Sequence, residues 1–227
     1  MHTQASRIRG GIAPLPLRRG GMRQLSRHLN RIATLLAAGF LLTISGAALA
    51  ELRVQAATPP LQRFVQPGYM LQPPGEPGWV LASRTPYQLI LGKAGAGADE
   101  SYIIEATLIH VPADQLDRLQ QWVADSEARD TDPARFSQQT REVAPFEGKN
   151  TPCIASHTVS EDRQPHRRSG NSRPMILELY AYTCILPSNR TLALHLGYSF
   201  RHEPGHDDAE LAQKANQLML GLMFTGM

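Results

Sequence analysis

The sequence predicts an α+β fold, an antiparallel sheet of about five to six strands covered by two helices. Three observations predict it: stretches in which apolar and polar residues alternate, short turns between such stretches, and two segments with a helical apolar period. Short turns join antiparallel strands, and the apolar face of a sheet needs helices to cover it. We therefore expect one α+β domain over residues 78–227.

Six stretches show the alternation of strands. It is clearest after residue 191, where every second side chain is apolar and the residues between are small or polar. The apolar set is Leu192, Leu194, Leu196, Tyr198 and Phe200, and the other set is Ala193, His195, Gly197, Ser199 and Arg201. The predicted strands cover residues 79–83, 87–92, 101–111, 153–161, 175–186 and 191–202. This pattern predicts a sheet with one covered face and one solvated face.

Two segments show the helical period. Residues 113–129 carry an apolar stripe through Leu119 and Val123, with Asp and Gln around it, and residues 208–223 carry a second stripe. A Glu stands three positions after Asp207, which is typical of a capping box at the start of a helix. We expect these two helices to cover the apolar face of the sheet.

The composition is that of a globular protein, but the charge is unevenly distributed. Of the 227 residues, 42% are hydrophobic and 19% charged, which excludes a disordered, collagen-like or coiled-coil chain. The first fifty residues hold seven Arg and no Asp or Glu, which leaves 16 basic against 20 acidic residues in the remainder. Because that remainder is acidic, we expect no nucleic acid partner.

Residues 1–50 are predicted to be a signal peptide. Three Arg precede an uncharged stretch over residues 32–49, and the small side chains of Ala48 and Ala50 suit cleavage after Ala50. A complete signal begins at Met22, so we expect Met22 to be the true start. The alternative is an uncleaved membrane anchor, because about 18 apolar residues can span a bilayer. Cleavage predicts a periplasmic protein of a Gram-negative bacterium, or a secreted one, with no membrane span in the mature chain.

The mature chain begins with a Pro-rich segment. Residues 51–77 contain six Pro, a density that excludes a helix or a central strand. We expect an extended arm there, followed by the domain of residues 78–227.

The two Cys of the chain, Cys153 and Cys184, both belong to the exported part. An oxidising compartment favours a disulfide between them. If residues 153–161 and 175–186 form a hairpin, the two Cys lie almost opposite each other, which a disulfide requires. The alternative is a reactive thiol, but the C-x-x-C spacing typical of redox sites does not occur.

The order of the predicted elements ends in a sheet hairpin and a helix that closes on Leu218, Leu220, Leu222 and Phe224. This order resembles the PsbP-like fold of the photosystem II extrinsic subunit P family over about the last 150 residues. That family largely contains accessory proteins that dock onto larger assemblies, so the resemblance implies a binding or assembly role. It carries over no functional residue, and the Pro-rich arm and an Arg-rich loop depart from it.

The string from His202 to His206 matches the zinc-protease motif H-E-x-x-H. That motif needs a helix to place both His on one face, and the Pro-Gly pair between them disfavours a helix. We therefore expect no zinc-protease chemistry, and a polar strand-to-helix turn is the main alternative. A looser metal site built from loops also stays open. Its candidate ligands are His202, His206, Asp207 and Asp208.

The eleven residues from Arg163 to Arg173 contain four Arg and are predicted to form a hairpin loop. Guanidinium groups bind phosphates and carboxylates, so this loop is a candidate contact for lipid headgroups, cell-wall polymers or an acidic partner. The alternative is a mobile, solvated hairpin tip. The candidate partner-binding residues are Arg163, Arg167, Arg168 and Arg173.

These patterns favour an exported accessory protein that binds a ligand or a partner, either an envelope protein or an anionic envelope component. We predict no cofactor and no catalytic residue. The alternative is a small metal-dependent or other hydrolase at the turn between His202 and His206, and a purely structural envelope protein is a third reading. His195 is interpreted as a sheet histidine satisfied by its neighbours, because no G-x-S-x-G elbow accompanies it.

Overall fold

The computed structural model describes residues 55–56 and 63–226. The predicted signal peptide, the predicted start at Met22 and the cleavage site after Ala50 lie outside the described residues. So do parts of the predicted arm, residues 51–54 and 57–62.

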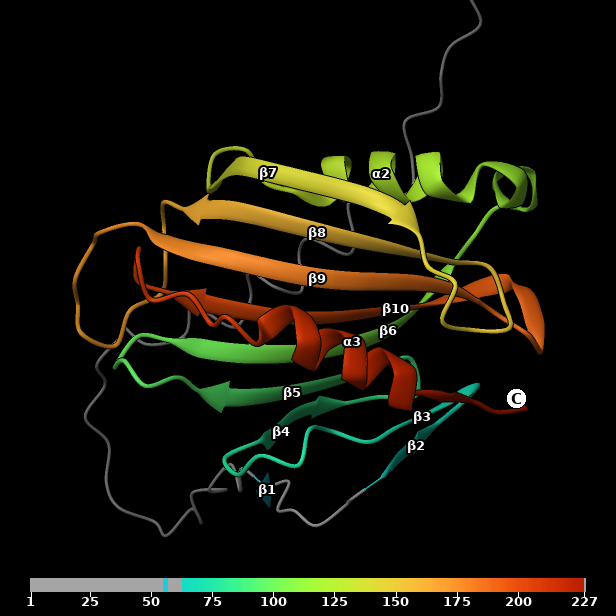
Figure 1. Ribbon diagram of the computed structural model, residues 1–227, viewed down its shortest axis with the longest axis horizontal. Coiled ribbons are helices and arrows are strands. Elements are labelled where there is room, and N and C mark those ends of the chain that lie inside the picture. The colour runs from blue at the N-terminus through green and yellow to red at the C-terminus, as the bar shows by residue number, and fades with distance from the viewer. Residues whose placement is uncertain (1–54, 57–62, 227) are drawn as a thin grey trace, which may run out of the picture. The chain divides into compact units, whose positions relative to one another are not determined.

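An eight-stranded sheet forms the centre of the described chain (Figure 1). Its order is β1-β4-β5-β6-β10-β9-β8-β7, and every neighbouring pair is antiparallel. The strands are β1 (Gln55–Ala56), β4 (Val80–Arg84), β5 (Gln88–Ala94), β6 (Ser101–His110), β7 (Phe136–Pro145), β8 (Cys153–Asp162), β9 (Met175–Leu186) and β10 (Asn189–His202). Strands β6 and β10 lie in the middle, and β10 pairs with both β6 and β9.

A second sheet is built partly from the predicted arm. Its three strands, in the order β11-β3-β2, are β2 (Phe64–Gln66), β3 (Tyr69–Leu71) and β11 (Met223–Phe224). Gly68 turns the chain between β2 and β3 with a φ of 82°, which favours glycine. Phe64, Tyr69 and Leu71 are fully buried in the main core. This part of the predicted arm forms two strands whose apolar side chains are buried in the core of the domain.

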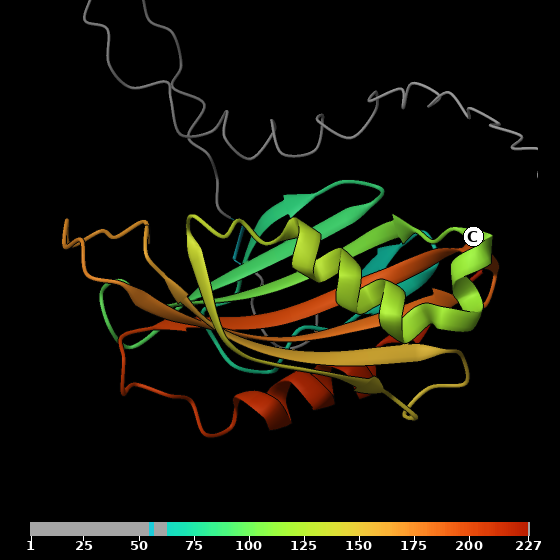
Figure 2. The ribbon, with the colours of Figure 1, turned by 90° about the horizontal axis from the view of Figure 1, so that it is seen from above.

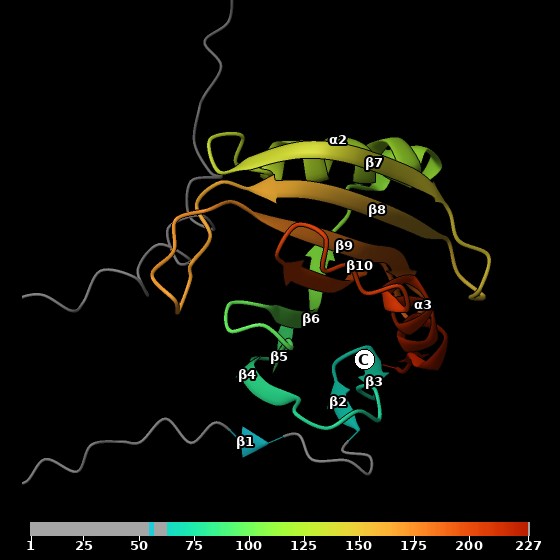
Figure 3. The same cartoon turned by 60° about the vertical axis from the view of Figure 1, so that its left-hand side comes forward.

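The helices lie on opposite faces of the large sheet (Figure 2). A 3₁₀ helix, η2 (Ala113–Arg118), leads into α2 (Leu119–Asp130), and α3 (Leu211–Gly221) follows β10. Figure 3 shows the small sheet on the same side as α3. The large sheet therefore has one face covered by α3 and the small sheet, and another covered by α2.

The predicted α+β class, with five to six strands under two helices, is wrong. The chain is mostly β: seven strands of five residues or more and the short β1 form one sheet, three more form another, and the described residues contain only two α-helices. The strand β7 was not predicted, because its middle, from Ser137 to Glu142, is a run of polar residues. It lies at the sheet edge, where a strand needs little apolar alternation.

The second helix also begins later than predicted. Its first residue is Leu211, and Asp207 makes no capping bond to it. Instead the side chain of Asp208 accepts a hydrogen bond of 2.9 Å from the backbone N–H of Glu210. The polar turn after His202 is therefore longer than the capping pattern indicated.

The predicted disulfide is confirmed. Cys153 of β8 and Cys184 of β9 are direct partners in the antiparallel ladder, and their sulfur atoms are bonded. Both Cys are buried beside Tyr182 and Leu194 in the core on the α3 side of the sheet. The bridge joins two neighbouring strands at the end of the sheet opposite the Arg-rich loop.

The two faces of the sheet carry two separate apolar clusters. The larger one, under α3, contains large side chains such as Trp79, Leu91, Tyr198 and Met219. The smaller one, under α2, contains Val111, Leu119, Val123, Ile154, Ile185 and Ala193. The α2 face is thus only partly filled by apolar side chains.

Candidate functional site

The four candidate metal ligands do not converge. The string H-E-P-G-H runs from the end of β10 into a turn in which Gly205 has a φ of +85°, so it is not helical. The side chain of His202 is fully buried, and its Nδ1 donates a hydrogen bond of 2.8 Å to the carbonyl of Glu203. The side chain of Asp207, 77% exposed, lies 3.7 Å from that nitrogen.

The other two candidate ligands are held by different partners. His206 Nδ1 lies 2.8 Å from a carboxylate oxygen of Glu100, and Asp208 accepts hydrogen bonds from Tyr102 and Lys214 at 3.0 and 2.9 Å. Within residues 63–226 no group of three or more His, Cys, Asp or Glu is placed to hold a metal ion. The turn therefore has the geometry of a set of separate polar contacts.

The Arg-rich loop connects β8 to β9, and one of its four Arg anchors it. The guanidinium of Arg167 is 1% exposed, forms ion pairs with Asp99 and Glu203, and donates to the carbonyls of Arg173 and Pro174 at 2.9 and 3.0 Å. A guanidinium with these partners is not free to bind another molecule.

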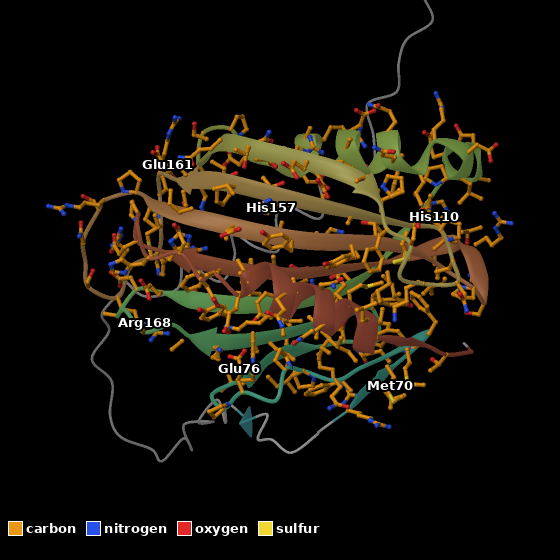
Figure 4. The ribbon with its side chains drawn as sticks, in the orientation of Figure 1. Met70, Glu76, His110, His157, Glu161 and Arg168 are labelled. Carbon is orange, nitrogen blue, oxygen red and sulfur yellow. A yellow bond between two sulfur atoms is a disulfide. The ribbon has the colours of Figure 1, made fainter. Side chains whose placement is uncertain are left out.

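The three other Arg of this loop face solvent. Arg163 pairs with Glu161 at 3.2 Å, and Arg168 and Arg173 are exposed. Figure 4 shows Arg168 at the end of the sheet. The loop therefore presents Arg168 and Arg173 as available cations on a backbone that Arg167 fixes.

Sequence reasoning missed an open cavity of about 520 Å³ between α2 and the sheet. Its walls come from α2, from Phe136 at the start of β7, and from side chains of β6, β8, β9 and β10 that point to the α2 face. Segments far apart in the sequence thus meet in one hollow. Cavities that bind small molecules have volumes of about 300–1,000 Å³, so this one is of suitable size.

The sequence of α2 explains why the cavity is not filled. In the first half of the helix, Leu119 and Val123 are buried and pack on the sheet. One and two turns later the same side of the helix presents Ser126, Glu127 and Asp130, which line the cavity. The apolar stripe of α2 is therefore replaced by polar side chains where the helix passes over the hollow.

The floor of the cavity is a row of polar side chains across three strands. Thr107, His195 and Thr183 are direct cross-strand partners on β6, β10 and β9. The hydroxyl of Thr183 lies 3.1 Å from Nδ1 of His195. The next pair along these strands, Gly197 with Ala181, has no side chain longer than a methyl group, and Leu179 covers Gly197, because a Cβ added there would lie 3.2 Å from its side chain. The polar row therefore borders the room that α2 does not fill.

Three carboxylates line the cavity. Glu105 accepts hydrogen bonds of 2.9 Å from the side chains of Gln88 and Thr107, which are both neutral. Glu127 accepts from Ser156 at 2.6 Å and lies 3.2 Å from the guanidinium of Arg141. Asp130, the last residue of α2, is exposed. Among the described residues that line the cavity none is Lys or Arg.

The imidazole of His195 is neutral in this environment. Burial lowers the pKa of His195 from its ordinary value, and the negative charges of Glu127, Glu105 and Asp130 only partly oppose this shift. The side chain therefore presents a polar but uncharged ring to the cavity. The interpretation as a sheet histidine bonded to a neighbour agrees with the contact to Thr183, but it does not account for the hollow beside the ring.

A second groove, of about 610 Å³, runs along α3 beside the segment from Gln72 to Glu76. Its charged groups already have partners: Lys214 contacts Asp208 at 2.9 Å, Glu210 at 3.4 Å and Glu76 at 3.9 Å. Both grooves are open to solvent, but only the cavity under α2 combines aromatic walls with charged groups that lack an ionic partner. We therefore regard the α2 cavity as the candidate site.

Two signals in the sequence could have indicated the cavity. The stripe of α2 changes from apolar to polar after Val123, although the helix continues to Asp130. In β10 the residues opposite the apolar set include His195 and Gly197, which do not form a core. A helix that stops being apolar over a strand of small and polar residues indicates a space between them.

Comparison of the chain with protein-family models and with curated proteins gave no match. No helix in residues 63–226 is both long and apolar enough to cross a membrane.

Proposed function

We propose that the mature chain is an exported accessory protein of the bacterial envelope that binds a small, partly apolar ligand in the cavity beneath α2. The observation that carries this proposal is the cavity itself, with its apolar wall of Ile109, Trp122 and Leu179 and its polar row at Thr107 and His195. Binding sites for small molecules typically combine apolar walls with a few polar groups that fix orientation.

Export and an accessory role are part of the same proposal. The leader pattern of residues 1–50 and the disulfide between Cys153 and Cys184 support an oxidising compartment, for which we propose the periplasm. The likeness to the PsbP-like family, inferred from the order of elements, agrees with an accessory role. We keep that likeness as a proposal.

The test is to recover the ligand. The mature protein is purified from the periplasm of its own host and examined by native mass spectrometry, beside Ser126→Trp, which fills the cavity, and Gln121→Trp, which places the same side chain on the exposed side of α2. We expect an added mass on the wild type and on Gln121→Trp that is absent from Ser126→Trp. An added mass that all three proteins retain, or that none carries, would refute binding in this cavity.

A second candidate function is docking through the Arg-rich loop. The buried anchor at Arg167 supports it, because it fixes a loop that exposes Arg168 and Arg173. The target would be an acidic envelope protein or an anionic envelope component. Crosslinking in the periplasm should capture a partner that is lost when Arg168 and Arg173 are changed to Ser, whereas equal capture by both forms would contradict it.

The alternative of a metal-dependent hydrolase depended on the turn between His202 and His206. His202 and His206 are held by Glu203 and Glu100 respectively, and the described residues contain no metal-binding group there. No observation of the described residues favours this alternative over the cavity.

A further inference from the structure

We propose that the cavity beneath α2 selects an organic cation, a protonated amine or quaternary ammonium that carries an apolar body. This inference rests on the proposed function and deepens it, since it names the class of ligand. It stands on the charges that face the cavity, on the pairing of the cations around it, and on its aromatic walls.

Three of the four Arg side chains near the cavity are paired with carboxylates. Arg141 lies against Glu127 at 3.2 Å, and Arg135 makes two hydrogen bonds of 3.0 and 2.9 Å to Asp162, which also lies 3.5 Å from Arg201. The fourth, Arg129, makes no ion pair within residues 63–226, but it is exposed and donates a hydrogen bond of 2.9 Å to the hydroxyl of Ser126, so solvent screens its charge. None of the four guanidinium groups is among the residues that line the hollow.

The carboxylates that line the cavity do not all have a cation as a partner. Glu127 has Arg141 as its ionic partner, but Glu105 is held only by the neutral side chains of Gln88 and Thr107, and Asp130 makes no ion pair within residues 63–226. The charges of Glu127, Glu105 and Asp130 act against the effect of burial on the pKa of His195, so these three carboxylates face the ring. Field lines from fixed charges are focused inside a cleft, so a cation is attracted and an anion is repelled.

The walls suit the apolar body of such a ligand. Trp122 from α2 and Ile109 and Leu179 from the sheet line the hollow and are half-buried. An indole ring also attracts a cation placed over its face. The neutral ring of His195 adds a polar group without a positive charge. An ammonium group near Glu105 with its hydrocarbon part against Trp122 would use both properties.

The experiment compares three probes of one shape and different charge: phenethylammonium, 2-phenylethanol and 3-phenylpropionate. Affinities are measured by isothermal titration calorimetry on the mature protein, and Trp122 fluorescence reports occupancy of the cavity, because Trp79 is buried on the other side of the sheet. We expect the cation to bind at least about tenfold more tightly than the alcohol and the anion to bind most weakly, with the preference falling as salt is added.

Two matched variants locate the charge. Glu105→Gln keeps the shape of the cavity and removes a carboxylate, whereas Glu161→Gln makes the same change outside it, on the α3 side of the sheet (Figure 4). We expect Glu105→Gln to weaken the cation about tenfold without changing the alcohol, and Glu161→Gln to change neither. Circular dichroism confirms that each variant is folded.

The outcomes distinguish between binding of a ligand in the cavity and preference of the cavity for a cation. If cation and alcohol bind equally and Ser126→Trp abolishes both, the cavity is a binding site but the preference for a cation is overturned. If Glu105→Gln binds the cation as tightly as the wild type does, the assigned role of Glu105 is overturned. If none of the probes binds saturably, the inference of a cation-binding cavity fails, whereas the proposed function fails only if the native mass spectra show no added mass that Ser126→Trp removes.

Discussion

Beneath α3, the side chains of β10 fill the space between helix and sheet, whereas beneath α2 the same strand leaves a hollow. On the α3 side it presents Leu194, Leu196 and Tyr198, which are almost completely buried. On the α2 side the residues between them are small or polar, among them His195 and Gly197. A single strand therefore contributes to a close-packed core on one face and to a cavity on the other.

The difference shows that one face of a β-sheet can supply the stabilising core while the other face keeps a binding site. Because alternate side chains point to opposite faces, residues on one face can be chosen for packing without changing those on the other. The large cluster under α3, with the small sheet, supplies most of the buried apolar side chains. The α2 face can then keep polar groups and a hollow that would otherwise weaken the fold.

The two faces should differ most in how far a truncation to Ala lowers the free energy of unfolding. Leu196→Ala, in the α3 core, should lower the free energy of unfolding by about 3 kcal/mol, since it removes a fully enclosed side chain. Ile109→Ala, at the edge of the α2 cavity, should cost about 1 kcal/mol, because that side chain is only half-buried beside an existing space. Urea denaturation of both variants measures the difference, and equal costs would show that the α2 face is packed as tightly.

Asp162 is fully buried at the end of the α2 face. Its substitution should lower the free energy of unfolding by an amount comparable to that of Leu196→Ala. Burial alone would raise the pKa of Asp162, but hydrogen bonds and charge from Arg135, with the charge of Arg201, hold it below its ordinary value. Asp162→Asn should therefore cost about 3 kcal/mol at neutral pH, because two guanidinium groups lose their counter-charge.

The pH dependence of this variant has a definite sign. A carboxylate with a lowered pKa in the folded state stabilises the fold above its ordinary pKa of about 4, and that contribution is lost as the pH falls through the lower folded value. The difference in unfolding free energy between wild type and Asp162→Asn should therefore shrink below about pH 4. A difference that stays constant down to pH 2 would contradict the ionic role of Asp162.

The disulfide should contribute a similar amount. Cys153→Ser with Cys184→Ser opens a bridge between residues separated by 31 positions in sequence, for which loop-closure entropy predicts about 2–4 kcal/mol. The ladder between β8 and β9 remains, so the folded state should persist and the cavity should keep its affinity for phenethylammonium. Loss of binding at a temperature where the variant is folded would show that the bridge positions the α2 side as well.

Substitution of His195 should have the smallest effect on the free energy of unfolding. Because its pKa is lowered in the folded state, the unfolded chain takes up this proton first as the pH falls, so wild type loses stability below about pH 6.5. His195→Gln removes this contribution, and the difference in unfolding free energy between wild type and variant should change in favour of the variant between pH 7 and pH 5. The groups that face His195, namely Glu105, Glu127, Asp130 and Thr183, are the same in both proteins.

The sequence predicted two helices and six of the seven strands of five residues or more, but it missed β7 and the small sheet, so it underestimated the share of β-structure. Alternation identified β10 because its two faces differ strongly, and the same criterion missed β7, whose polar middle gives no such contrast. The hairpin of Phe64, Tyr69 and Leu71 was hidden by the prolines around it, since proline density indicates extended chain but not whether that chain packs. The disulfide could be predicted, because its geometry follows from one hairpin.

The site was harder to predict, because it depends on spacing between elements rather than on a motif. The string from His202 to His206 matches the letters of a metal motif, but its Pro-Gly pair favoured a polar turn, and in the structure its side chains make separate contacts. Conversely, Glu105, Glu127 and His195 lie on three different elements and form no motif. Only the crossing of α2 over the sheet brings them to one hollow.

The most direct test of the central claim is to map where a cation binds. ¹H–¹⁵N NMR spectra of the mature protein are recorded during titration with phenethylammonium. The account predicts saturable shifts in the second half of α2, from Trp122 to Asp130, and in the sheet at Thr107, Thr183 and His195. Shifts confined to the groove beside α3, or shifts under α2 that do not saturate, would contradict the assignment of this cavity as the binding site.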